Sequence, residues 1–240
     1  VEALVREHGD QLAAIIVEPV AANVGLILPD PGFLAFLREQ ADRCGAVLIF
    51  DEVISGFRFC FGGYQNLCGV KPDLTCLGKA IGGGMPVGAV GGRADIMERL
   101  APLGDVYQAG TLSGNPVSVA AGLANLRTLA KLNPFAELEQ RTQRLVKELK
   151  VAAAAAGLKV QIPQLGSIFS IFFADHPIHD FDDVMRTNKD LYVKMFHALL
   201  NDGVYLPPSA FEVSFLSIAH TVALIDQALV AWKRALAQLT

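Results

Sequence analysis

Two short apolar segments separated by a helix-like stretch constrain the fold of this chain more than any other feature. Leu12–Val17 is rich in isoleucine and valine, and Ala46–Phe50 (AVLIF) forms a second such run. Runs of this kind are typical of strands buried on both faces of a parallel sheet. Between them, Phe33–Ala41 has apolar residues at helical spacing, with Pro31 before it and Gly45 after it. The pattern predicts a βαβ unit with parallel strands and a right-handed crossover.

The segments that follow suggest two domains. In the first we expect further strands and helices at Leu74–Leu77, Pro86–Gly91, Asp95–Leu100 and Pro116–Leu132. In the second we expect a helix ending at Gly157, strands at Leu158–Ile162, Ser167–Phe173 and Gly203–Leu206, and helices at Asp182–Asn201 and Thr221–Leu239. The predicted fold class is therefore α/β. Residues 1–132 would carry a mainly parallel sheet, and residues 133–240 would form a smaller α+β domain.

Composition and charge argue against several function classes. The chain of 240 residues has a formal net charge of −4 and no basic run, so we expect no nucleic-acid partner. Its longest apolar runs are far shorter than the roughly 18 residues of a membrane span, so we expect no membrane insertion. The four cysteines form no CxxC pair, which favours reduced thiols, a cytoplasmic protein and no metal site.

The first residues resemble the interior of a domain. Val1 is not a methionine, and no charged segment followed by an apolar one indicates a signal peptide. We therefore expect the chain to begin inside a longer protein.

Two residues stand where an open α/β sheet binds its ligands, at the carboxyl ends of strands. Asp51 directly follows the AVLIF strand, and its carboxylate would need a partner there, since burying an unpaired charge is costly. A local salt bridge or a loop cap explains Asp51 equally well. Lys79 follows an apolar strand and precedes Gly82–Gly84. In a partly desolvated pocket its amine could act as a nucleophile, whereas alone it reads as a surface lysine.

Three common site motifs are absent. The positions around Lys79 lack the first glycine and the Ser or Thr of a Walker A loop. No G-x-G-x-x-G follows the first strand, and no G-x-S-x-G occurs. The sequence therefore does not support a nucleotide-binding P-loop, a Rossmann site or a hydrolase elbow.

Taken together, these segments resemble the class III aminotransferase family of pyridoxal-phosphate enzymes (fold type I). The matching stretches are IIVEPVAANVG, LIFDEVISGFR, LGKAIGGGMPVGAVGG, QAGTLSGNPVSVAAGLA and GVYLPPSAFEVSFLSIAHT. They span nearly the whole chain. The resemblance implies the C-terminal half of the large cofactor-binding domain followed by the small domain, because chains of the family are longer and begin earlier.

The resemblance also implies roles for individual residues. Lys79 would form the Schiff base with pyridoxal 5'-phosphate and move the proton between substrate carbons, while Asp51 would pair with the pyridine nitrogen. Val53 would pack on one face of the ring. Gly110 and Thr111 would contact the cofactor phosphate of the other subunit, which implies a homodimer.

Two further residues gain roles only through the family. Asn23 would lie near the phenolic oxygen of the cofactor, although by itself it reads as an ordinary turn residue. Glu212 resembles an active-site glutamate near the amino groups of the substrate, although alone it reads as a solvated loop carboxylate. His220 receives no catalytic role.

Three functions follow as alternatives. The stretches TLSGNP and PSAFE favour an aminomutase that uses pyridoxamine 5'-phosphate to convert glutamate-1-semialdehyde into 5-aminolevulinate for tetrapyrrole synthesis. An ordinary class III aminotransferase would need an external amine donor and often a mobile arginine, and 209–220 contains none. The third alternative is a truncated, non-catalytic product.

Overall fold

The computed structural model describes residues 1–239 and divides them into two compact units. One unit contains Val1–Pro19 and Pro29–Asn133, and the other contains Val20–Leu28 and Pro134–Thr240. The short segment Val20–Leu28 therefore packs with residues that follow it by more than a hundred positions. No helix in the described residues is long and apolar enough to cross a membrane.

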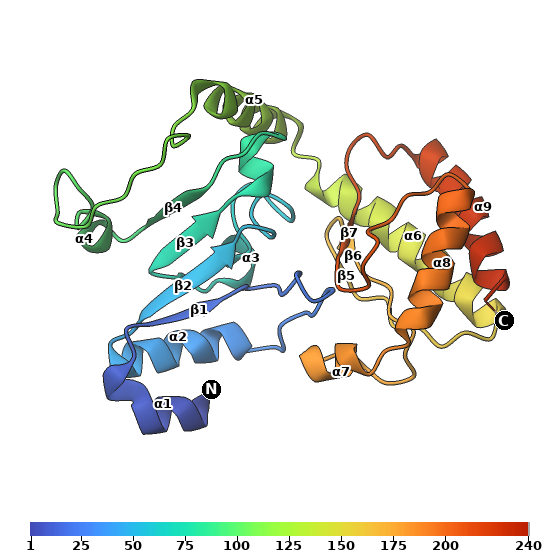
Figure 1. Cartoon of the computed structure of the whole chain (residues 1–240), viewed down its shortest axis with the longest axis horizontal. Coiled ribbons are helices and arrows are strands. Elements are labelled where there is room, and N and C mark those ends of the chain that lie inside the picture. The colour runs from blue at the N-terminus through green and yellow to red at the C-terminus, as the bar shows by residue number, and fades with distance from the viewer. Residues whose placement is uncertain (240) are drawn as a thin grey trace. The chain divides into compact units, whose positions relative to one another are not determined.

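The first unit is built on a four-stranded sheet. Its strands lie in the order β1 (Ala14–Val17), β2 (Val47–Glu52), β3 (Leu74–Leu77) and β4 (Ala89–Gly92). β1, β2 and β3 are parallel, and β4 runs antiparallel to β3 (Figure 1). The βαβ unit and the mainly parallel sheet predicted from the sequence are confirmed.

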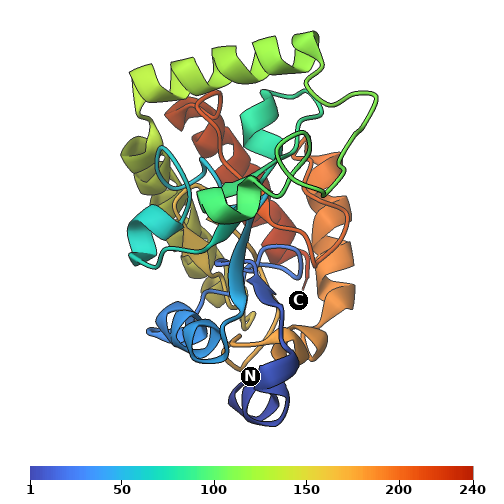
Figure 2. The ribbon, with the colours of Figure 1, turned by 90° about the vertical axis from the view of Figure 1, so that its left-hand side faces the viewer.

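Helix α2 (Phe33–Cys44) connects β1 to β2 and packs against β2. Its buried residues Leu34, Leu37 and Ala41 contact Leu48 and Phe50. Each fully buried leucine contributes about 1.5–3 kcal/mol to the free energy of folding. Figures 1 and 2 show α2 running beside β1 and β2.

The remaining helices of this unit are short, apart from α5. They are α1 (Glu2–His8), η1 (Gly9–Gln11), α3 (Gln65–Cys68), η2 (Lys79–Gly82), α4 (Ala94–Met97) and α5 (Pro116–Leu132). The side chain of Asn115 accepts hydrogen bonds from Val117 N and Ser118 N at the start of α5. The predicted start of this helix at Asn115-Pro116 is thereby confirmed.

The buried carboxylate of Asp73 links several elements at the end of the sheet where β2 and β3 begin. Asp73, just before β3, accepts hydrogen bonds from Arg38 Nη1 of α2 at 2.7 Å, from Leu48 N of β2 at 2.7 Å and from Arg93 Nη1 at 3.0 Å. Burial alone would raise the pKa of Asp73, but these hydrogen bonds outweigh it and lower the pKa to about 2.

We expect the Asp73 network to make stability depend on pH in acid. The pKa is depressed in the folded state, so the stabilisation is present above the unfolded value near 4 and is lost as pH falls toward 2. Between pH 5 and pH 2 the free energy of unfolding should fall by about 2 kcal/mol more in the wild type than in Asp73→Asn. Urea unfolding at each pH measures this difference. Equal pH slopes in the two proteins would contradict it, and the exposed Asp10→Asn should keep the wild-type slope.

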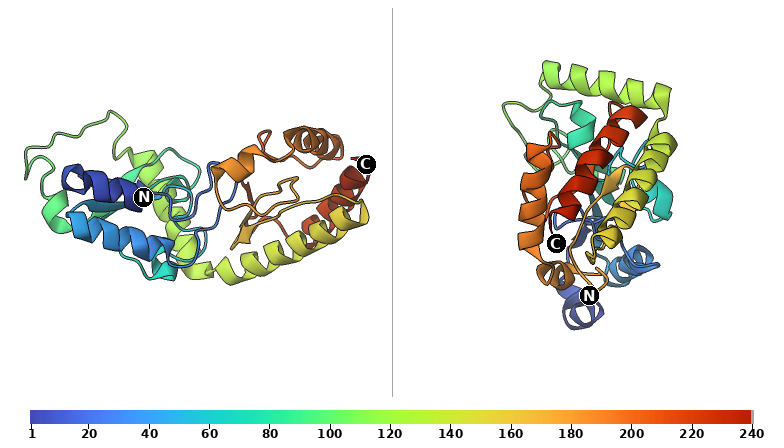
Figure 3. Two further views of the ribbon diagram at one scale, coloured as in Figure 1. Left: turned by 90° about the horizontal axis from the view of Figure 1, so that it is seen from below. Right: turned by 90° about the vertical axis from the view of Figure 1, so that its right-hand side faces the viewer.

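The second unit packs helices around a small antiparallel sheet. The strands are β5 (Gln164–Leu165), β6 (Ile168–Phe169) and β7 (Ser214–Phe215), in that order. The helices are α6 (Phe135–Ala155), α7 (Phe181–Met185), α8 (Lys189–Asn201) and α9 (Val222–Ala237). The core centres on buried Leu149, Met195 and Trp232, which come from α6, α8 and α9. Figure 3 shows α6 and α9 side by side, with α8 next to α9.

Three predictions for the second unit were wrong in detail. The predicted helix Asp182–Asn201 is two helices, because Asn188 accepts a hydrogen bond from Leu191 N and starts α8 anew. Gly203–Leu206 is not a strand, and Leu158–Ile162 forms only one isolated bridge, between Gln161 and Phe172. Apolar residues in these segments pack on the core without pairing into a sheet.

Candidate active site

Asp51 and Lys79 lie at the same edge of the sheet of the first unit. Asp51 is the penultimate residue of β2, and Lys79 follows the end of β3 after Gly78. β2 and β3 are hydrogen-bonded parallel neighbours, with Asp51 opposite Cys76. The carboxyl ends of both strands therefore point to one edge, where open α/β sheets bind their ligands.

The alternation of β2 separates Asp51 from the residues of the core. Leu48, Phe50 and Glu52 are buried, whereas Asp51 on the opposite face is only partly buried. Asp51 Oδ1 accepts a hydrogen bond from Val53 N at 3.0 Å. This contact is the loop cap that the sequence allowed as one interpretation. It orients the carboxylate without neutralising its charge.

Lys79 has an unusual backbone conformation at the start of η2. Its φ is +44°, a left-handed value that costs a non-glycine residue about 1–3 kcal/mol. The residue before it, Gly78, lies close to Val53: a Cβ on Gly78 would be 3.2 Å from Val53 Cγ1. Val53 therefore lies beside the backbone that carries Lys79. Backbone strain such as the positive φ of Lys79 is typical of functional sites.

Helix α5 packs against η2 and fixes its backbone. Asn125 Nδ2 donates a hydrogen bond to Ala80 O at 2.7 Å. A Cβ on Gly122 would lie 2.2 Å from Ile81 O, so only glycine allows this close approach. Asn125 and Gly122 therefore fix the backbone that presents Lys79, and sequence reasoning missed both of them.

A second carboxylate, Glu52, secures the loop after β2. Its side chain is fully buried, and both of its oxygens accept hydrogen bonds. Oε2 accepts from Ser55 Oγ at 2.7 Å and Tyr64 N at 2.6 Å, and Oε1 accepts from Gln65 N at 3.1 Å and Gln65 Nε2 at 3.3 Å. A Cβ on Gly63 would lie 2.2 Å from Oε1. Two sequence features could have indicated that Glu52 is buried: its position in the alternation of β2, on the same face as Leu48 and Phe50, and the glycine at position 63.

We expect Glu52→Gln to destabilise the chain by about 2–3 kcal/mol. The amide has one acceptor oxygen. Whichever way it is oriented, its NH₂ group therefore faces a backbone N–H donor, either that of Tyr64 or that of Gln65. Urea unfolding measures the loss. Glu39→Gln, an exposed substitution on α2, is the matched control and should stay within about 0.5 kcal/mol of the wild type. A loss no larger than that of the control would contradict the anchoring role.

The thiols beside this edge are not activated. Burial and the charge of Asp51 raise the pKa of Cys76, and burial and the charge of Glu52 raise that of Cys60. All four cysteines are free. Among residues 1–239 no group of three or more His, Cys, Asp or Glu side chains could hold a metal ion.

Gly110 and Thr111 lie in an exposed turn that leads into α5. Ser113 N donates a hydrogen bond to Gly110 O at 2.9 Å. Gly110 lines a groove of about 920 Å³ together with Gly88, Gln108 and Asn115, but the side chain of Thr111 does not line it. This turn approaches the start of α5 at Pro116. Among the described residues, no hydrogen bond or ion pair joins Gly110 or Thr111 to Asp51 or Lys79.

Asn23 and Glu212 lie on two segments of the second unit that are hydrogen-bonded to each other. Gly25 N donates a hydrogen bond to Phe211 O, and Leu26 N donates one to Ser170 Oγ at 3.0 Å. The first bond joins the loop that carries Asn23 to the turn that carries Glu212, and the second joins the same loop to the residue after β6. Glu212 is exposed, and burial together with its charge raises the pKa of Tyr192 to about 12.

The predicted site residues therefore form two groups. Asp51, Val53 and Lys79 lie at the sheet edge of the first unit, while Asn23 and Glu212 lie in the second, on segments joined by the hydrogen bond from Gly25 N to Phe211 O. The residues present at the sheet edge fit a pyridoxal cofactor, because a carboxylate and a lysine amine stand beside a branched apolar side chain and a glycine backbone.

Comparisons with known proteins agree on one family. A family model described as aminotransferase class-III matches residues 1–236. The chain is 55% identical over 227 residues to a glutamate-1-semialdehyde 2,1-aminomutase of Desulforudis audaxviator, covering 95% of this chain and 52% of that protein. An aminomutase of the same name from Syntrophobacter fumaroxidans is 54% identical over 220 residues, covering 92% of this chain and 51% of that protein.

Solved structures lead to the same family. An omega-transaminase from Sphaerobacter thermophilus has a TM-score of 0.89 at 35% identity and covers 99% of this chain and 55% of its own. A glutamate-1-semialdehyde aminomutase from Pseudomonas aeruginosa in complex with PMP has a TM-score of 0.86 at 25% identity and covers 100% and 54%. The chain thus spans about half the length of the relatives it matches.

Proposed function

The chain belongs to the class III aminotransferase family, and on that premise we propose that it forms part of a glutamate-1-semialdehyde 2,1-aminomutase. The observation that carries this proposal is the meeting of Asp51, Val53 and Lys79 at one sheet edge, in a chain 49–55% identical to relatives of that name. We assign residues 1–132 to the large cofactor-binding domain and residues 133–240 to the small domain.

The cofactor would be pyridoxal or pyridoxamine 5'-phosphate. When bound, it supplies an electron sink and a carrier for the amino group. Lys79 Nζ would hold the cofactor covalently and then move a proton between the two carbons that exchange the amino group. The positive φ of Lys79 supports this role, because the hydrogen bond from Asn125 to Ala80 O and the close packing of Gly122 hold the lysine backbone in this strained arrangement.

Asp51 would accept a hydrogen bond from the protonated pyridine nitrogen. Val53 N already occupies Oδ1, so Oδ2 is the oxygen left for that contact. A carboxylate there keeps the ring nitrogen protonated, since an opposite charge favours the charged form. Val53 would contact one face of the ring.

The other predicted residues complete the proposal. Asn23 would bind the phenolic oxygen of the cofactor, and Glu212 would receive the amino groups of the substrate. Gly110 and Thr111 would bind the phosphate of the cofactor held by the partner of a homodimer. Their exposure on the turn before α5 leaves them open to such a contact. The reaction would serve tetrapyrrole synthesis in the cytoplasm.

A class III ω-aminotransferase is the second candidate. The structural similarity to an omega-transaminase, with a TM-score of 0.89, favours it. Sequence identity favours the aminomutase over this candidate, because the chain is 55% identical to an aminomutase and 35% identical to the transaminase. The absence of arginine from 209–220 also argues for the aminomutase. A non-catalytic product is the third candidate, since the chain spans about half of its relatives.

The deciding assay supplies glutamate-1-semialdehyde without an amine donor. The protein is the complete reading frame that contains this chain, loaded with pyridoxamine 5'-phosphate. We expect catalytic turnover to 5-aminolevulinate. Product limited to one equivalent of cofactor, or formed only with an added amine, would support the aminotransferase. A protein that neither binds the cofactor nor forms product would support the non-catalytic alternative.

A further inference from the structure

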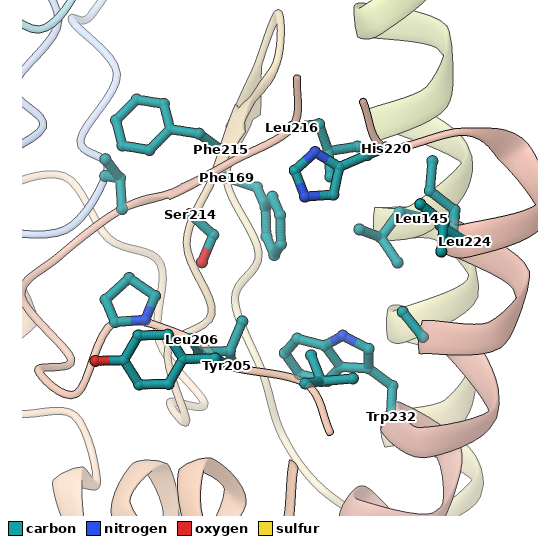
Figure 4. Close-up of a pocket in the computed structure, with 15 residues that line it drawn as sticks. Leu145, Phe169, Tyr205, Leu206, Ser214, Phe215, Leu216, His220, Leu224 and Trp232 are labelled. Atoms are coloured by element: carbon teal, nitrogen blue, oxygen red, sulfur yellow. The ribbon is translucent and has the colours of Figure 1, made fainter. Parts of the chain in front are cut away.

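The apolar groove of the second unit takes no part in supporting Lys79. Figure 4 shows its lining, which includes Phe169, Leu224 and Trp232. All of the residues that line it belong to the second unit. Within the first unit, the backbone of Lys79 is supported by the contact between η2 and α5.

Helix α5 and η2 meet backbone to backbone. A Cβ on Gly122 of α5 would lie 2.2 Å from Ile81 O, and a Cβ on Gly83 would lie 2.7 Å from a backbone oxygen of α5. This closeness brings the side chain of Asn125 within reach of η2, where its Nδ2 donates a hydrogen bond to Ala80 O at 2.7 Å. Asn125 is partly buried, so this bond is shielded in part from competing water.

The hydrogen bond of Asn125 acts on a strained segment. Ala80 directly follows Lys79, whose φ of +44° lies in the left-handed region that non-glycine residues rarely adopt. Such a conformation persists only where the surrounding structure enforces it. Without a donor for Ala80 O, η2 loses one of the contacts that oppose the return of Lys79 to a negative φ. Asn125 therefore helps to maintain the strain.

The direction of the lysine side chain depends on this backbone. Lys79 is exposed, so packing within the described residues does not hold its side chain. Rotation about φ turns the Cα–Cβ bond relative to β3, which precedes Lys79. A change from +44° to a common negative value would therefore move the amine relative to Asp51 on β2. A misplacement of about 1 Å at a reacting group costs about 10²-fold in rate.

We propose that Asn125 is a positioning residue for Lys79. Its hydrogen bond to Ala80 O keeps the lysine in the arrangement from which the amine attacks the aldehyde carbon of pyridoxal 5'-phosphate. In that step a C=N bond forms and water leaves. Asn125 acts through Lys79 and transfers no proton itself. The inference rests on the proposed function and adds to it a requirement for one side chain of α5.

The first test measures covalent attachment in the complete reading frame that contains this chain. Asn125→Leu keeps the branched shape of asparagine but has no donor, and Asn125→Asp keeps that shape but presents an oxygen to Ala80 O. Borohydride reduces the C=N bond only after it has formed. We therefore expect both variants to acquire the lysine-linked label about 10- to 100-fold more slowly than the wild type, as followed by mass spectrometry.

Turnover in the donor-free assay separates positioning from general damage. We expect kcat to fall by a similar factor, while KM for glutamate-1-semialdehyde changes by less than about 3-fold, because the lysine is displaced and the substrate contacts are not. Thr128→Ala is the matched control on α5. Its exposed hydroxyl donates to Ala124 O of the same helix, so the control should keep the wild-type labelling rate and kcat.

A second test needs no cofactor. Urea unfolding compares the effect of Asn125→Leu in the wild type and in Lys79→Gly, since glycine accepts a φ of +44° without strain. In the wild type the variant releases strain as it loses the hydrogen bond, whereas with glycine there is no strain to release. We expect the unfolding constant to rise about 5- to 30-fold more in the Lys79→Gly background.

Two results would overturn the proposal. One is an equal rise of the unfolding constant in the two backgrounds, and the other is a wild-type labelling rate and kcat in both Asn125 variants. A wild type that acquires no lysine-linked label removes the proposed function and this inference with it. A labelled wild type with unaffected Asn125 variants removes this inference alone.

Discussion

Lys79→Ala should abolish the borohydride-stable cofactor label and lower 5-aminolevulinate formation by about 10²–10⁴-fold. The magnitude is that of a positioned proton-transfer group, and the amine is also the proposed point of covalent attachment. The measurement is mass spectrometry of borohydride-treated protein from the complete reading frame, together with the donor-free assay. Lys71→Ala, at an exposed lysine before β3, should retain both the label and the activity.

The backbone at Lys79 adds an internal control that needs no cofactor. Alanine and glycine both remove the amine, but only glycine accepts a φ of +44° without strain. We therefore expect Lys79→Gly to be about 1–2 kcal/mol more stable than Lys79→Ala in urea unfolding. A surviving lysine-linked label in either variant would refute the assignment of Lys79.

Asp51→Asn should keep the fold and the bound cofactor but lose most of the turnover. Asparagine still offers Val53 N an acceptor, so we expect stability to change by less than about 1 kcal/mol. Losing the charge that faces the pyridine nitrogen should destabilise the transition state by about 2–5 kcal/mol, which corresponds to a decrease in turnover of about 30- to 4,000-fold.

Asp51→Ala separates the two duties of this carboxylate. It removes the acceptor for Val53 N as well as the charge, so it should lose stability in addition to turnover. The absorbance of the bound cofactor and its pH dependence report on the ring nitrogen. Wild-type turnover in Asp51→Asn would exclude the proposed pairing.

Local pattern was enough to predict the skeleton of the first unit. Periodicity identified α2 and the strands β1, β2 and β3, and Asn115-Pro116 marked the start of α5. The order of the elements then implied that Asp51 and Lys79 share one edge of a parallel sheet. These inferences succeed because the side-chain period, the helix caps and the βαβ handedness act over a few residues or one crossover.

Contacts between residues far apart in the sequence could not be predicted from local patterns. The anchoring of Glu52 by the Tyr64–Gln65 backbone and the packing of Gly122 on Ile81 O join segments that no local pattern connects. The break before α8 depends on Asn188, whose side chain competes with a continuous helix. Short apolar runs such as Gly203–Leu206 are ambiguous, because core packing and strand pairing require the same residues.

The sequence by itself sufficed to identify the family, through five stretches that resemble it, and to place Asp51 and Lys79 at the carboxyl ends of strands. Tertiary structure alone revealed the strained backbone of Lys79, its support by Asn125 and the enclosure of Glu52. Each of these arises where chain segments far apart in the sequence meet, and the free energy of such a meeting is a property of the packed arrangement and not of any single segment.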